Sequence, residues 1–397
     1  MNPATTTAMR ILVFGIALLI ATGIASLLPA LPLLANEFGV PLASTWSIIA
    51  AFALPGLICI PIVGAFADRV GRKRVLLPAL ALFALSGVAC VFAHTYTQLL
   101  VFRFVQGVGA SAFALMYTTL IADTWQGHER LTMMSWSSVV LGLGTAASPA
   151  IGGALAMLDW RLPFLLSLAA LPLMFLAYRL PLPPPGTSSS FRAYAGACLS
   201  CVRDRQTLIL LSLTLLTFIM LSGPLLTCFP ILAKQKFQAT PLETGLILAL
   251  ASLAAGFAAL NLPKLYRRYS THTLLLSVTT LYIIGFICIS TLPALWLLAP
   301  AALLYGLAQG LNIPLVSTLL ADQAEDSRRT SLLALNGILL RLGQIIGPAI
   351  FGTLAGWAGA SWAIAAGSVP ALIMILLVVA QRLHLSAKPH YTTAEYP

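Results

Sequence analysis

Two arginines stand inside stretches of the sequence that are otherwise apolar, Arg103 in the first half and Arg341 in the second. A guanidinium in such a place costs several kcal/mol unless it faces a cavity or a partner. No acidic residue lies in the middle of any apolar run, so the two cations would leave a central cavity positive and favour an anionic or zwitterionic solute. The alternative is neutralisation by Asp123 or Asp322. These lie at the ends of their runs, where pairing with loop arginines fits their depth better.

No arrangement typical of a catalytic or metal centre accompanies these arginines. The five histidines lie near the ends of apolar runs, without Ser/His/Asp or metal-ligand spacing. Most of the six cysteines lie in apolar stretches and are expected to be small buried hydrophobes. Cys198 and Cys201 lack the two further ligands of a tetrahedral zinc site. A G-x-x-x-x-G-K-[ST] phosphate loop is also absent, so we expect no enzyme, no metal and no cofactor.

The composition around these residues is that of an integral membrane protein. Of 397 residues, 59% are hydrophobic and 8% charged, whereas soluble proteins carry about 25% charged residues. The net charge of +11 would suggest nucleic acid in a soluble protein, but no basic face with interleaved aromatics exists outside short loops. Apolar runs of about 20 residues, enough to cross a bilayer as a helix, occur about twelve times. They lie near residues 10–34, 44–66, 75–94, 96–122, 131–157, 161–180, 206–232, 242–263, 272–291, 294–320, 331–357 and 361–383.

A proline- and serine-rich stretch separates six runs from six. We therefore predict an all-α membrane protein with twelve transmembrane helices in two pseudo-symmetric six-helix bundles. Most of the 22 Lys and Arg residues fall on one side if both termini are cytoplasmic, and this bias predicts a multi-pass protein of the cell (inner or plasma) membrane with that orientation. The predicted parts are an N-terminal bundle (1–180), a cytoplasmic linker (181–205), a C-terminal bundle (206–383) and a cytoplasmic tail (384–397).

The two halves repeat each other, which indicates a duplication. Residues 106–109, Q-G-V-G, correspond to residues 309–312, Q-G-L-N, and residues 148–153, S-P-A-I-G-G, are echoed by residues 347–352, G-P-A-I-F-G. One charged turn breaks the symmetry. Its counterpart at residues 264–269 keeps the cations but has no aspartate.

That turn, residues 64–74, reads G-A-F-A-D-R-V-G-R-K-R and is the densest charge cluster of the chain. Its first glycine would let a helix pack closely on a neighbour, and its second permits a positive φ. The carboxylate would be held by a cation or by the positive N-terminus of another helix. The pattern resembles the loop between helices 2 and 3 of the major facilitator superfamily, understood there as a conformational latch, although it could serve only as a topology anchor. The latch residues would be Gly64, Asp68, Arg69, Gly71 and Arg72.

Two further motifs resemble the same superfamily. The R-x-x-Q-G-x-G pattern of Arg103 and Gln106 is implicated in proton coupling in its antiporters. Alternatively, the arginine fixes helix packing through backbone carbonyls. In the fifth run the sequence resembles the antiporter motif G-x-x-x-G-P-x-x-G-G of exporters, with Ser148 where the family has glycine. The matching residues are Gly144, Pro149, Gly152 and Gly153.

Over nearly the whole chain the sequence is most similar to the twelve-helix drug/proton antiporter branch of this superfamily. The resemblance implies alternating access, a latch at Asp68 that stabilises the outward-open state, and proton-driven efflux of a small amphipathic molecule. We expect a monomer in the lipid bilayer, with the proton gradient as driving force and no nucleic-acid partner. The residues expected to serve proton coupling or the cavity are Arg103, Gln106, Asp123 and Arg341. The other expected cavity residues are Tyr117, Gln309, Asn312, Asn336 and Gln344.

The proton carrier is not evident from the residues. Many such antiporters have an acidic residue in the first helix, where this chain has Ala25 and Ser26. A second possibility is an exporter of a specific anionic metabolite, such as a siderophore or sugar acid, which the two buried arginines favour. A receptor that transports nothing would show no flux in proteoliposomes.

Overall fold

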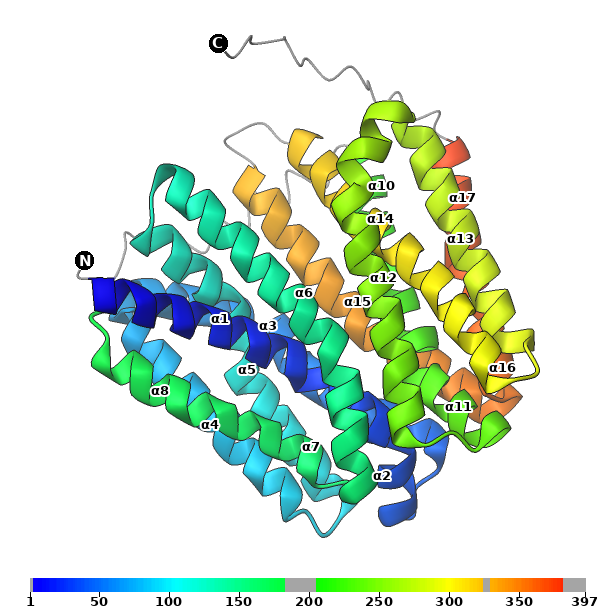
Figure 1. Cartoon of the computed structure of the whole chain (residues 1–397), viewed down its shortest axis with the longest axis horizontal. Coiled ribbons are helices and arrows are strands. Elements are labelled where there is room, and N and C mark those ends of the chain that lie inside the picture. The colour runs from blue at the N-terminus through cyan, green and yellow to red at the C-terminus, as the bar shows by residue number, and fades with distance from the viewer. Residues whose placement is uncertain (1–2, 183–204, 324–328, 381–397) are drawn as a thin grey trace.

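The computed structural model describes residues 3–182, 205–323 and 329–380, and helices make up its regular structure. In these ranges, twelve segments are long and apolar enough to cross a membrane. They form two groups that lie side by side, coloured blue to green and green to red in Figure 1. The predicted all-α architecture with twelve spans is thus confirmed. The linker and the C-terminal tail lie largely outside the described residues.

The first group, here the N-terminal bundle, contains all elements before the linker. The helices are α1 (Pro3–Ala25), η1 (Leu28–Ala30), α2 (Leu31–Glu37), η2 (Leu42–Thr45), α3 (Trp46–Val70), α4 (Arg72–Val91), α5 (Tyr96–Thr124), α6 (Gly127–Leu158), α7 (Leu162–Leu165), η3 (Leu166–Ala169) and α8 (Ala170–Arg179).

The second group, the C-terminal bundle, follows the linker. The helices are α10 (Arg205–Met220), the π-helix η4 (Leu221–Cys228), α11 (Phe229–Phe237), α12 (Pro241–Arg268), α13 (Thr271–Thr291), η5 (Leu295–Leu297), α14 (Leu298–Gln323), α15 (Arg329–Ala358), α16 (Ala360–Ala366) and α17 (Ser368–Ala380).

Local sequence sets several helix boundaries. Gly71, at φ 98°, is the only residue between α3 and α4, and a residue with a Cβ would be strained there. Capping boxes begin α5 and α12, in which the side chains of Thr95 and Thr240 accept hydrogen bonds from the backbone N–H groups of Gln98 and Glu243. Several helices extend beyond the apolar runs, for example α6, which begins at Gly127. Hydropathy identifies only the part of a helix that lies within the membrane, so the polar first turn of such a helix falls outside the predicted run.

Among the described residues, the two bundles share a hydrophobic core at only one end of the helices. We call this the joined end; it carries α2, η2 and α11. One continuous cluster there includes Leu31 and Ile48 of the N-terminal bundle together with Phe229 and Phe351 of the C-terminal bundle. The end with the α3–α4 turn at Gly71 is called the basic end. Toward it, a second cluster contains residues of the N-terminal bundle alone, so the bundles converge at the joined end and spread toward the basic end (Figure 1).

Candidate functional site

The crossing of α6 and α12 at the joined end brings the backbones of the two bundles together. A Cβ on Gly153 of α6 would overlap the carbonyl oxygen of Pro241, and a Cβ on Gly245 of α12 would overlap that of Pro149. Each helix thus presents a glycine to a carbonyl of the other. Glycines at helix crossings allow this close approach.

The four residues of the antiporter-like motif divide between two neighbours. Pro149 and Gly153 face α12, as described above. A Cβ on Gly152 would overlap the backbone of Ser26 beyond the end of α1, and one on Gly144 would lie 2.9 Å from side-chain atoms of Leu18 and Ala21. The motif therefore packs α6 against both α1 and the opposite bundle.

A second crossing, of α3 and α15, also joins the bundles. Gly352 packs on the indole of Trp46, and a Cβ on Gly356 would lie 3.0 Å from the Cβ of Ala43. Farther from the joined end, a Cβ on Gly56 would lie 3.5 Å from Nε of Arg341.

Beyond Arg341, three glycines of the helices that join the bundles face open space. An added Cβ would meet nothing within 4 Å at Gly337 of α15, at Gly142 of α6 or at Gly256 of α12. These glycines lie in the middle or the basic half of helices that are tightly packed near the joined end. The structure is therefore closed at the joined end and open toward the basic end, with Arg341 near the point where the bundles part.

Arg103 is enclosed by the N-terminal bundle. It is 1% exposed; one terminal nitrogen donates to Oε1 of Gln106 at 2.6 Å and the other to the carbonyl of Gly23 on α1 at 3.1 Å. Its guanidinium carbon lies 4.3 Å from the ring centre of Phe52 on α3, and Nε has no hydrogen-bond partner among the described residues. Beside it is a cavity of about 10 Å³, room for about one water. Arg103 therefore ties α5 to α1 and α3.

Gln309 and Asn312 lie inside the C-terminal bundle, 7% and 0% exposed. Oε1 of Gln309 accepts from the hydroxyls of Tyr282 at 2.7 Å and Tyr305 at 3.2 Å, and Nδ2 of Asn312 donates to Oγ1 of Thr217 at 2.5 Å. Nε2 of Gln309 and Oδ1 of Asn312 have no partner among the described residues. Sequence reasoning missed Tyr282 and Thr217, which no motif marked.

Arg341 differs from Arg103 in that it stays half-buried at the crossing of the two bundles. One terminal nitrogen donates to Oε1 of Gln344 at 3.0 Å, and no carboxylate among the described residues forms an ion pair with it. Asn336, on the same helix, accepts from Oγ1 of Thr214 at 2.7 Å. Tyr117 is half-buried against the core of the N-terminal bundle.

At the basic end, Nε of Arg72 lies 3.2 Å from Oδ2 of Asp123. This joins the start of α4 to the end of α5, and the expectation that Asp123 pairs with a loop arginine is confirmed. Asp123 is thus at the end of its span, away from Arg103. For Gly64, Asp68 and Arg69 only the backbone of α3 is described, so the latch contacts themselves lie outside the described part.

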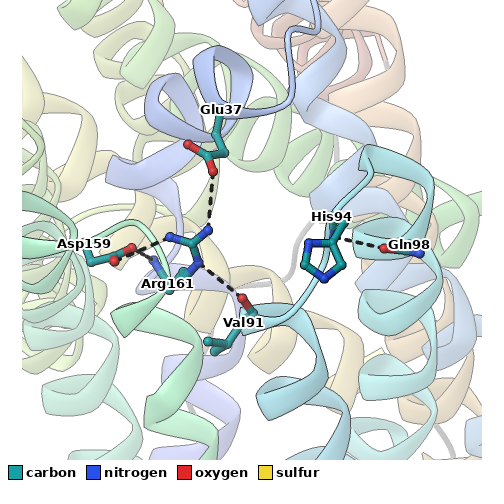
Figure 2. Close-up of polar contacts among 6 residues, drawn as sticks. All are labelled: Glu37, Val91, His94, Gln98, Asp159 and Arg161. Atoms are coloured by element: carbon teal, nitrogen blue, oxygen red, sulfur yellow. Dashed lines mark hydrogen bonds and ion pairs between the residues drawn. The ribbon is translucent and has the colours of Figure 1, made fainter.

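The joined end carries its own charged cluster around Arg161, which lies between Glu37 and Asp159 in Figure 2. Its terminal nitrogens are 3.4 Å from Oε1 of Glu37 and 3.6 Å from Oδ2 of Asp159, and Nε donates to the carbonyl of Val91 at 3.3 Å. The three charged side chains are 41–43% exposed. Glu37 is therefore an ion-paired group at the helix ends, and His94 lies at the same end (Figure 2).

The sequence matches the family model described as Major Facilitator Superfamily over residues 13–295 and 210–394. The quinolone resistance protein NorA of Staphylococcus aureus is 23% identical over 339 residues, 85% of this chain and 87% of NorA. The bacillibactin exporter of Bacillus subtilis is 31% identical over 157 residues, 38% of this chain and 39% of the exporter. An MFS-type transporter of Mycobacterium tuberculosis is 34% identical over 154 residues, 38% of this chain; the match spans 22% of that longer protein.

Solved structures show the same fold. The nucleoside transporter NupG superposes with a TM-score of 0.78 at 13% identity, over 95% of this chain and 99% of NupG. The human organic anion transporter MFSD10 gives a TM-score of 0.66 at 21% identity, over 95% of this chain and 100% of MFSD10. Family members are membrane transporters of small molecules and not enzymes. With its motifs, its twelve spans and the match over most of its length, this chain belongs to the Major Facilitator Superfamily.

Proposed function

We propose that this protein is a proton-coupled exporter of small amphipathic molecules that works by alternating access. The observation that carries the proposal is the reciprocal packing of Gly153 on Pro241 and of Gly245 on Pro149 at the joined end, opposite an open basic end. At such a crossing backbone meets backbone, so α6 and α12 can separate without disengaging interlocked side chains. The resemblance of the α6 motif to that of exporters and the relative NorA, named for quinolone resistance, support export.

In this proposal the basic end faces the cytoplasm, because its loops carry most of the cations. The conformation described here is then open to the cytoplasm and ready to take up cargo. The latch at Asp68 would stabilise the opposite, outward-open state. Arg103 would link proton binding to α1, since it holds the backbone of that helix at Gly23.

A second candidate is an exporter of a specific anionic metabolite. It is favoured by Arg341, which has no acidic partner among the described residues and lies where the bundles part. The bacillibactin exporter, a relative over part of the chain, is named for one specific compound. The two candidates share the fold and the path and differ in cargo.

The test is flux in proteoliposomes that hold the purified full-length chain. A quinolone would serve as the cargo, and a pH gradient would be imposed and then collapsed with a protonophore. We expect gradient-dependent movement that Asp68→Asn slows at least about tenfold, since one charged hydrogen bond contributes about 1.5–3 kcal/mol.

Glu129→Gln, which removes an exposed carboxylate in the first turn of α6 at the same end, is the control and should leave the flux unchanged. Flux that ignores the gradient would contradict proton coupling. A folded Asp68→Asn protein that transports at the wild-type rate would contradict the latch.

A further inference from the structure

We propose that Arg341 and Gln344 form the recognition site for a carboxylate of the transported molecule, so that the protein selects amphipathic organic anions over cations and neutral analogues. This inference rests on the proposed function, because it names the substrate class of the same path. It is carried by the position of Arg341, by the hydrogen-bonding groups that it and Gln344 leave open, and by the charges of the described spans.

The position of Arg341 makes it available to cargo from the basic end. Toward the joined end the bundles are in contact, at Gly352 with Trp46, and farther along α15 Arg341 lies against Gly56. One turn nearer the basic end, Gly337 is exposed and faces open space. A molecule that enters between the bundles from the basic end would therefore reach Arg341 where they converge.

Most of the open hydrogen-bonding groups of this pair are donors. A guanidinium has five N–H groups and no acceptor, and one terminal nitrogen of Arg341 donates to Oε1 of Gln344 at 3.0 Å. This bond engages the carboxamide oxygen of Gln344 and leaves its NH₂ group as a donor. Both side chains retain some exposure. A carboxylate accepts two parallel hydrogen bonds from a guanidinium, whereas an ammonium group would meet like charge.

The remaining charges of the described spans do not offset this preference. Arg103 is 1% exposed and both of its terminal nitrogens donate within the N-terminal bundle, so it is closed to cargo, but its charge adds to the local potential. It contacts Phe52 on α3 and Arg341 lies against Gly56 on the same helix, one turn or about 6 Å apart along the axis. Carboxylates among the described residues, such as Asp123 and Glu37, lie at the helix ends. An anion at Arg341 is therefore the favourable complement to this region.

The competing explanation is that Arg341 only packs against α3, as Arg103 does within its own bundle. The two explanations differ in ligand preference. A packing residue would give no discrimination between an acid, its amide and an amine of the same shape. A recognition residue would give discrimination that disappears when the guanidinium is removed.

The test is binding to the purified full-length protein in detergent, measured by isothermal titration calorimetry with no gradient present. Three probes of matched shape are used: 2-naphthylacetate, 2-naphthylacetamide and 2-naphthylmethylammonium. Arg341→Gln removes the charge, Arg341→Lys keeps the charge but not the paired donors, and Arg130→Gln removes an exposed arginine near the start of α6 as a control. Size-exclusion profiles and unfolding temperatures verify that each variant is folded.

We expect the wild type and Arg130→Gln to bind naphthylacetate about 10- to 100-fold more tightly than the other probes, the range of a charge-assisted hydrogen bond. Arg341→Gln should abolish this preference, and Arg341→Lys should retain part of it. The proposal is overturned if the wild type binds the three probes alike, if it does not bind naphthylacetate, or if the preference survives in folded Arg341→Gln. Because binding needs no proton gradient, such a failure is distinct from failure of proton-driven export, which the proteoliposome assay reports.

Discussion

The glycine at position 245 gives the sharpest test of how the bundles are joined. In Gly245→Ala, the new Cβ would lie 2.8 Å from the carbonyl carbon of Pro149 and 3.2 Å from Cα of Ala150, where contacts of about 3.5–4.0 Å are favourable. Both neighbours are backbone atoms, which no rotamer change can move. The helices α6 and α12 must therefore separate by several tenths of an ångström at the joined end.

The expected size of the effect follows from the cost of overpacking, about 1–3 kcal/mol. If that cost falls on the joined conformation alone, its population relative to the alternative falls about 5- to 150-fold. The control is Gly256→Ala on the same helix, where a Cβ meets nothing within 4 Å. Both changes give the same gain of about 1 kcal/mol in helix propensity, so the difference between them isolates the contact with α6.

The measurement is the distance between spin labels at Asn36 of α2 and Ala358 of α15, two exposed positions at the joined end in different bundles. The native cysteines are first replaced, and double electron–electron resonance is recorded in detergent. Gly245→Ala should add a population at longer distance, and Gly256→Ala should match the parent. Identical distributions for the two variants, with both proteins folded, would refute the reasoning.

Two further predictions concern charged groups. Arg103→Met keeps a side chain of similar length but removes a buried charge that has no carboxylate partner. We expect an unchanged or higher unfolding temperature together with gradient-driven flux that is at least about tenfold slower. A destabilised protein with normal flux would contradict this prediction. Asp123→Asn should lower the free energy of unfolding by about 1 kcal/mol, and Glu37→Gln should lower it by less than about 0.5 kcal/mol. The reason is burial: the side chain of Arg72 is 9% exposed in its pair with Asp123, whereas those of Arg161 and Glu37 are more than 40% exposed. Unfolding by denaturant in detergent measures both, and equal losses would show that burial does not control these pairs.

The placement of the spans and of Asp123 could be predicted because both depend on depth along a helix. Apolar length fixes which segments cross a bilayer, and a carboxylate at the end of a span can reach a loop arginine such as Arg72. The fate of the two buried arginines could not be predicted in the same way. Arg103 and Arg341 both stand inside apolar runs, but one is enclosed within its bundle and the other lies between bundles.

The sequence by itself determined that this is a twelve-helix membrane protein with a duplicated plan and a family-specific charged turn. Hydrophobic length and charge placement are local properties, and the bilayer selects on them directly. Only the tertiary structure decided which glycines face the other bundle, which end is closed and which arginine lies between the bundles. Helices that are apolar nearly all round carry no signal for the direction in which a side chain points, since lipid and protein neighbours are equally apolar; that direction is set by how the packed helices meet.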